Sequence, residues 1–218
     1  MASGEMSETQ FIAFLTRAFR LLAEHSRDGS ISFQFMDWRH AYEIMTAGRE
    51  VYSELKNICV WNKDNGGMGS LYRSKHELVF VFKNGTAPHI NNVELGRFGR
   101  YRTNVWDYPG MSSKHAGRDD ILALHPTIKP VALAADAILD CSNPNDIVLD
   151  AFVGSGTTIL AAERTGRICY GIEIDPGYVD VAIARWQQMT GKVARLVDSD
   201  LAFADLAAKR SETVTKSR

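Results

Sequence analysis

The sequence predicts an α/β domain built on a mostly parallel sheet. Its 218 residues are 45% hydrophobic, which is enough for one sizeable core. Short apolar strands alternate with amphipathic helices, and this alternation is typical of α/β folds. Near residue 150 a buried strand runs into a glycine turn, a helix and a second apolar strand closed by acidic residues. Residues 1–218 are therefore expected to form a single domain.

The first half of the chain is predicted to start with a helix and then to alternate strands and helices. Ser7 is a suitable N-cap for a helix whose apolar stripe includes Phe11 and Phe14. Next, "SISFQFMD" is predicted to be a strand, "WRHAYEIMTAGREV" a helix and "KNICVWNK" a strand. "HELVFVFKNG" is expected to return antiparallel to "KNICVWNK". Residues 85–124 have no clear periodicity and are predicted to form a long functional loop or insertion.

The second half shows the clearest signals. "KPVALAADAILD" is predicted to be a helix with Pro130 in its first turn, and "DIVLDAF" a buried strand. "TTILAAERTG" is a helix ended by Gly166, and "RICYGIEID" a strand. "PGYVDVAIARWQQMTG" is a helix that Pro176 begins and Gly191 ends. "KVARLV" could add one strand, and residues 208–218 are expected to be a frayed polar tail.

Composition excludes several classes of protein. The chain has 25 basic and 26 acidic residues, so any contact with nucleic acid must come from a local patch. Cys59, Cys141 and Cys169 are far apart, which predicts reduced thiols in the cytoplasm and argues against disulfides or zinc. No apolar run reaches about 18 residues and no secretory leader is present, so no membrane contact is expected.

The glycine turn predicts a site for a nucleotide-like ligand. Glycines at 154 and 156 allow backbone to approach a ligand, and the helix near Thr157 aims its free N–H groups at the same space. Glu173 follows the next strand, where such folds place a carboxylate that binds ribose hydroxyls. The alternative is a tight turn that only packs a helix on a strand. Ile159 stands where the dinucleotide fingerprint needs a third glycine, which argues against NAD.

These residues carry a resemblance to a known family. "DAFVGSGTT" resembles the S-adenosylmethionine motif of amino-group DNA methyltransferases, which methylate N6 of adenine or N4 of cytosine. "HPTIKP", residues 125–130, resembles the segment that precedes this motif in circularly permuted members. Residues 60–85 are similar to the strand, loop and strand that the family places before its recognition region. The resemblance covers residues 7 to about 190.

The resemblance implies a class I methyltransferase-like, Rossmann-like α/β sheet that binds S-adenosylmethionine. Glu173 would bind the ribose, and Lys129 would pair with the cofactor carboxylate unless it is an ordinary surface lysine. Asp150 would bind loop amides or the cofactor amine, and Asp175 is expected to cap the helix at Pro176. The implied cofactor-binding residues are Thr127, Lys129, Pro130, Asp150, Phe152, Gly154, Ser155, Gly156, Thr157, Thr158 and Glu173.

One motif of the family is absent. Members orient the amine of the flipped base with a [DNS]-P-P-[YFW] tetrapeptide, but no two of the six prolines here are adjacent. No catalytic residue and no metal ligand is therefore assigned. We expect the sheet to lack its central strand, between "DIVLDAF" and "SISFQFMD", and the chain to be a fragment, a split subunit or a decayed gene. It would leave a gap, close around an altered pairing, or recruit an upstream segment or second polypeptide.

A local basic patch predicts contact with double-stranded DNA. Between Lys83 and Arg118 there are six Lys or Arg residues and two acidic ones, interleaved with aromatic residues. The predicted contacts are Arg97, Arg100, Arg102 and Lys114. The alternative is that "YRTNVWDY" is a strand facing the core.

The resemblance implies transfer of a methyl group from S-adenosylmethionine to N6 of adenine or N4 of cytosine in DNA, with adenine favoured as the commoner target. The base would be flipped out and the methyl group transferred directly, without a covalent enzyme intermediate. Two alternatives stay open, a nucleotide-dependent oxidoreductase and an inactive DNA-binding remnant. A homodimer also stays open.

Overall fold

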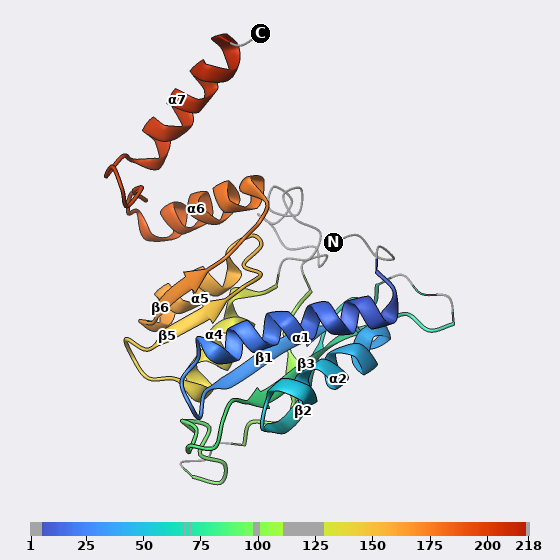
Figure 1. Ribbon diagram of the computed structural model, residues 1–218. Coiled ribbons are helices and arrows are strands. Elements are labelled where there is room, and N and C mark those ends of the chain that lie inside the picture. The colour runs from blue at the N-terminus through green and yellow to red at the C-terminus, as the bar shows by residue number, and fades with distance from the viewer. Residues whose placement is uncertain (1–5, 68, 70, 98–100, 111–128, 217–218) are drawn as a thin grey trace.

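The computed structural model describes residues 6–67, 69, 71–97, 101–110 and 129–216 (Figure 1). In this part of the chain the strands form two sheets, one of four strands and one of two. The predicted α/β class is confirmed, and the described sheet is divided.

The four-stranded sheet has the order β1-β3-β2-β4. Its strands are β1 (Ile31–Met36), β2 (Glu54–Asn62), β3 (His76–Lys83) and β4 (Val105–Asp107). β3 runs antiparallel to both β1 and β2, whereas β4 runs parallel to β2. The predicted antiparallel return of β3 is therefore right. The prediction of a mostly parallel sheet is wrong here, because β3 inserts between two strands that the α2 crossover would otherwise leave as parallel neighbours.

Helices cover both faces of this sheet. α1 (Glu8–Glu24) and α2 (Ala41–Val51, after a 3₁₀ turn at Trp38–His40) pack on one face, and α4 (Val131–Cys141) packs on the other. β3 shows why two cores form, because its successive side chains alternate between faces. Phe80 and Phe82 point into the core under α1 and α2, and Val79 and Val81 into the core over α4.

The two-stranded sheet carries the glycine turn. β5 (Ile147–Asp150) and β6 (Ile168–Gly171) are parallel and are joined through α5 (Thr157–Thr165). α5 packs against α4, so the same helical layer continues under both sheets. α6 (Pro176–Thr190) follows and packs on α5. Among the described residues no strand lies between β1 and β5, which agrees with the expected break in the sheet.

Three segments differ from the sequence prediction. β4 lies within residues 85–124, where a loop was expected; it has only three residues, too few to give a periodic signal. "KVARLV" forms only an isolated bridge, Arg195 to Ala202, rather than a strand. The tail predicted to fray is part of α7 (Phe203–Lys216), which extends away from the rest of the chain in Figure 1. Its Ala, Leu and Lys residues are strong helix formers, which explains a helix without packing.

No helix in the described part of the chain is long and apolar enough to cross a membrane.

Candidate functional site

The loop after β5 adopts a conformation that depends on glycine. In this loop, residues 151–156, Gly154 has φ +53° and Gly156 has φ +85°. A Cβ atom at Gly156 would lie 2.8 Å from the Cβ atom of Ala182 on α6. Gly156 is therefore required both for its backbone conformation and for the packing of α6. The packing explanation of the turn thus holds for Gly156, and it leaves the rest of the glycine loop to be explained.

α5 begins without a side-chain cap. Its N-cap is Gly156, which has no side chain to bond the first-turn amides. By contrast, Ser7 caps α1 in a capping box and Asp175 caps α6 by accepting from Gly177 N–H at 2.7 Å. The first N–H groups of α5 and its positive dipole end are thus free of a side-chain cap and suited to an anionic or polar ligand. The predicted capping role of Asp175 is confirmed.

Glu173 holds the glycine loop against the end of β6. Its Oε2 atom accepts a hydrogen bond from Gly154 N–H at 2.8 Å. Its Oε1 atom accepts from Ile174 N–H and Asp175 N–H, each at 2.9 Å. A carboxylate has about four acceptor positions, so about one remains on Oε2 for a ligand.

Asp150 organises the other side of the loop. Its Oδ1 atom accepts from Phe152 N–H at 2.9 Å, and its Oδ2 atom accepts from the Thr158 hydroxyl at 2.6 Å. The expectation that Asp150 binds loop amides is confirmed. Both carboxylates therefore shape the loop before any ligand arrives.

Lys129 links this loop to the four-stranded sheet. Its carbonyl accepts from the Thr157 hydroxyl at 3.2 Å. Its ammonium lies 3.4 Å from Glu77 Oε1 and 5.0 Å from the centre of the Phe35 ring. Glu77 also pairs with Lys63 at 3.1 Å, so Lys129 is not an isolated surface cation. Pro130 is the N-cap of α4, and Thr127 lies outside the described residues.

Two contacts near the loop were not predicted from the sequence. Arg185 on α6 donates to the hydroxyl of buried Ser155 at 2.9 Å and also to its carbonyl. Burial lowers the pKa of Arg185, since desolvation disfavours its charge. Phe152, which is 55% exposed, has its ring 6.1 Å from that of Phe14 on α1. The spacing of Ala182 and Arg185, one turn apart on α6, is the only sequence signal that could have indicated the first contact.

The predicted DNA contacts have different environments. Arg97 is exposed, whereas Arg102 lies 2.7 Å from Asp140 and 3.6 Å from Asp136, with its guanidinium 5.0 Å from the centre of the Trp106 ring. The Arg102 side chain is thus held between β4 and α4, and this placement does not support its expected role at DNA. Trp106 is buried, so the alternative of a core-facing strand applies to this segment. Arg100 and Lys114 lie outside the described residues.

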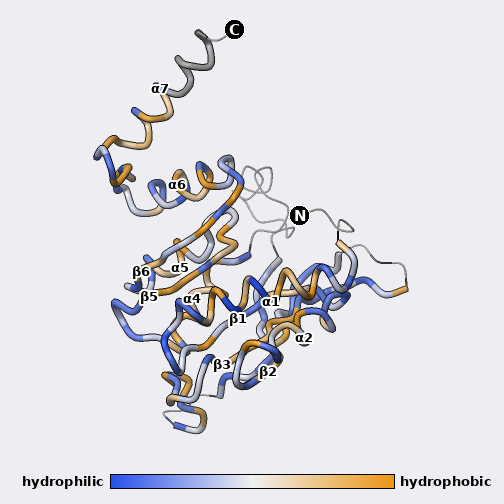
Figure 2. The backbone as a smooth tube through the Cα atoms, in the orientation of Figure 1, coloured by the Kyte–Doolittle hydropathy of each residue, from blue (hydrophilic) through white to orange (hydrophobic). Residues whose placement is uncertain are grey.

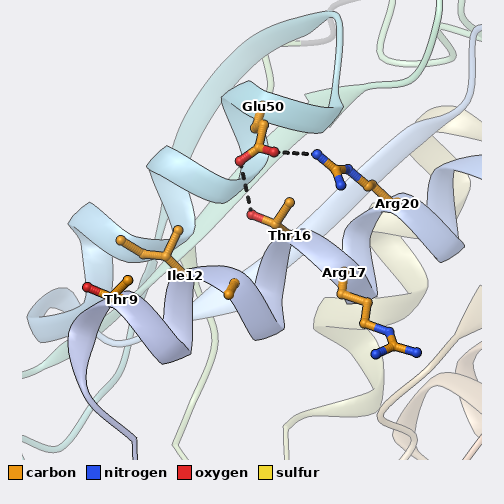
Figure 3. A pocket seen from close by; sticks show the side chains of 7 residues that line it. Thr9, Ile12, Thr16, Arg17, Arg20 and Glu50 are labelled. Carbon is orange, nitrogen blue, oxygen red and sulfur yellow. Dashed lines mark hydrogen bonds and ion pairs between the residues drawn. The ribbon is translucent and has the colours of Figure 1, made fainter.

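The hollows of the described surface lie elsewhere. One, of about 450 Å³, is lined by Thr9, Ile12, Ala13, Thr16, Arg17, Arg20 and Glu50 (Figure 3). There Glu50 pairs with Arg20 and accepts from the Thr16 hydroxyl, so the charged groups of α1 and α2 satisfy one another. A second, of about 570 Å³, includes His89 and Arg97. Neither touches the glycine loop, and the loop's chemistry rather than its depth marks it as the candidate site.

Thiol and metal chemistry find no support in the described residues. No group of three or more His, Cys, Asp or Glu side chains that could hold a metal occurs among them. Burial raises the pKa of Cys59 to about 11 and the pKa of Cys141 and Cys169 to about 12. The three thiols therefore stay protonated and unreactive near neutral pH.

Comparison with known proteins identifies the family. The model of the N6/N4 DNA methylase family matches residues 2–184. The chain belongs to this family. The match favours it over the nucleotide-dependent oxidoreductases that a glycine turn alone would also allow.

Individual relatives agree with the family. The type II methyltransferase M.HinfI of Haemophilus influenzae is 33% identical over 147 residues, which are 61% of this chain and 39% of that enzyme. The crystal structure of the M1.HpyAVI–SAM complex has 26% identity and a TM-score of 0.63, covering 80% of this chain and 81% of that one. The cytosine-N4-specific PvuII DNA methyltransferase has a TM-score of 0.69 at 16% identity, covering 85% and 74%, and shows the fold alone. The match to the curated relatives spans about a third of their length.

Proposed function

We propose that this chain is the S-adenosylmethionine-binding part of a DNA methyltransferase that acts on N6 of adenine or N4 of cytosine. The observation that carries the proposal is the hydrogen bond from Gly154 N–H to Glu173. It brings a carboxylate, a positive-φ loop and the uncapped start of α5 to one place. A ligand with both a polar amino-acid end and a ribose needs these groups together.

The residues present fit such a cofactor. The free first-turn amides of α5, which begins at Thr157, would receive its carboxylate, and the remaining acceptor position on Glu173 Oε2 would receive one ribose hydroxyl. The exposed ring of Phe152 would cover its apolar part. Lys129 would add positive charge at the same helix end, shared with Glu77. When bound, the cofactor supplies a methyl group activated by its sulfonium.

DNA is the proposed second substrate. Arg97, Arg100 and Lys114 would contact phosphates, with Arg102 acting inside the protein instead. Adenine N6 is the target base to test first, with cytosine N4 as the comparison. The tetrapeptide that would orient the amine is absent from the sequence. We propose that it comes from an upstream segment or a second polypeptide, with a homodimer as the simplest alternative assembly. A cytoplasmic location fits the reduced thiols.

Ligand binding by calorimetry tests the function directly. The chain is titrated separately with S-adenosylmethionine, NAD and an unmethylated DNA duplex. Saturable binding of S-adenosylmethionine, with none of NAD, is the expected result. Binding of NAD alone would indicate an oxidoreductase, and binding of DNA without either cofactor would indicate an inactive remnant. Transfer of a labelled methyl group to DNA, measured on the same sample, reports whether the chain is active by itself.

A further inference from the structure

The edges of β1 and β5 face each other with the same direction. Contacts on α1 place their carboxyl ends together: the Phe11 ring lies 5.1 Å from that of His40, after β1, and the Phe14 ring lies 6.1 Å from that of Phe152, after β5. At the opposite ends, Ile31 at the start of β1 and Cys141, shortly before β5, line one hollow. The two strands therefore run parallel, and in Figure 1 β5 lies on the β1 side of β6.

Both strands end as unpaired edges in the described structure. β1 pairs only with β3, and β5 pairs only with β6. Each exposes a row of backbone N–H and C=O groups, which is a template for another strand. Lys129, which contacts Phe35 of β1 and Thr157 of α5, spans the carboxyl ends of both. A strand between them would join the two sheets into one.

One face of the β5–β6 sheet is apolar and bare. Ile147 pairs in register with Ile168, and Leu149 with Tyr170, so all four share a face. Ile147, Ile168 and Tyr170 are 62%, 48% and 58% exposed. Figure 2 shows hydrophobic residues along both strands. The opposite face contains Cys169, whose pKa burial raises to about 12, so only one face is covered. We call Ile147, Leu149, Ile168 and Tyr170 the bare face.

The bare face and the two open edges are continuous. β1 has helices on both of its sides, with Phe33 and Phe35 against the α4 core and Met36 against the core of α1 and α2. β5 is covered only on the side of α4 and α5. What the described structure lacks is one strand in the sheet and one helix beside α1. Such a strand would be apolar on both faces, because helices would cover both.

We propose that a separate polypeptide docks here, with an apolar β-strand that pairs with β1 and β5 and an amphipathic helix that covers the bare face. The size of the relatives agrees with this, since the match spans 39% of M.HinfI and 74% of the PvuII enzyme. The proposal rests on the proposed function in one respect: the strand would end beside the glycine loop and present there the tetrapeptide that the family requires. The docking itself does not depend on the cofactor.

The test uses the full chain and a synthetic peptide. The peptide has an amphipathic helix followed by a strand of about six Val and Ile residues and Asp-Pro-Pro-Tyr. Binding is measured by calorimetry, and amide hydrogen exchange is followed strand by strand. We expect saturable binding, with exchange slowed at least about tenfold in β1 and β5 and unchanged in β4.

Matched variants locate the docking surface. The double substitution Ile168→Lys and Tyr170→Lys should weaken peptide binding at least about tenfold while leaving the unfolding midpoint of the chain unchanged. Val105→Lys is the control, because Val105 is as exposed as Ile168, at 48%, but lies on β4 at the far edge. An equal loss of binding in the control would overturn the proposal, and so would a lower unfolding midpoint in the double variant, since the face would then be covered by the chain itself.

Three further results would also contradict it. The peptide could fail to bind. The amides of β1 and β5 could already exchange slowly in the chain alone, which would mean that its own residues, such as 111–128, fill the place. Occupancy only when the segment is joined covalently before α1 would show that it belongs to the same polypeptide. S-adenosylmethionine binding without the peptide tests the cofactor site separately, and docking without methyl transfer would count against the proposed function alone.

Discussion

Glu173 and Gly154 are joined by a hydrogen bond of 2.8 Å between a carboxylate and a backbone amide. The two residues come from the ends of neighbouring parallel strands, so this bond fixes the glycine loop relative to β6. Because Glu173 also accepts from Ile174 and Asp175, one side chain organises three backbone N–H groups. The loop is thereby shaped before a ligand binds.

Glu173→Gln should weaken the cofactor site. The amide keeps one acceptor oxygen but replaces the other with a donor, which cannot bind the Gly154 N–H. We expect the free energy of unfolding to fall by about 1–3 kcal/mol. Affinity for S-adenosylmethionine should fall at least about tenfold in a calorimetric titration. Asp175→Asn is the neighbouring control, since Asn caps helices as well as Asp does. Unchanged affinity in Glu173→Gln would remove this residue from the site.

Gly156→Ala should destabilise the chain through two separable effects. A left-handed backbone costs a non-glycine residue about 1–2 kcal/mol, and the contact with Ala182 adds about 1–3 kcal/mol. Gly191→Ala isolates the first effect, because Gly191 has φ +70° and nothing lies within 4 Å of its added Cβ. Denaturation in urea should therefore show a larger loss for Gly156→Ala. Adding Ala182→Gly should recover part of it, and equal losses at the two glycines would refute the packing explanation.

The sequence predicts best where the local signals are strong. The helix that starts at Pro176 and ends at Gly191 was correct at both ends, because Asp175, Pro176 and Gly191 each act within one turn. The position of the glycine loop followed from the same kind of local evidence.

Long-range contacts could not be predicted in this way. Arg102 lies in a basic stretch and was therefore expected at DNA, yet its partners Asp136 and Asp140 lie on α4. Nothing near Arg102 in the sequence indicates that helix. β4 was missed for a related reason, since a three-residue strand is defined by its pairing with β2.

Asp140 should make stability depend on pH. Burial raises its pKa from 3.8 to about 6, although Arg102 acts in the opposite direction. Since the folded chain holds this proton more tightly than the unfolded chain, the contribution is complete below about pH 4 and is lost as the pH rises to about 6. For a partly buried group it amounts to about 1–2 kcal/mol. Asp140→Asn should therefore reduce the decline in the free energy of unfolding from pH 4 to pH 6. Exposed Asp205→Asn should leave it as in the parent, and so would Asp140→Asn if burial did not raise the pKa.

Arg97 and Arg102 should respond differently to replacement by alanine. Arg97 is exposed, so its loss should weaken DNA binding and lower the slope of log K against log salt by about 1, with stability unchanged. Loss of Arg102 leaves Asp140 and Asp136 without their cation and should lower the free energy of unfolding by about 2–4 kcal/mol. Salt-dependent DNA titration and urea denaturation of both variants separate the two roles. If Arg102→Ala kept its stability but lowered the salt slope, Arg102 would leave Asp140 to contact phosphate, and its placement between β4 and α4 would describe only the chain without DNA.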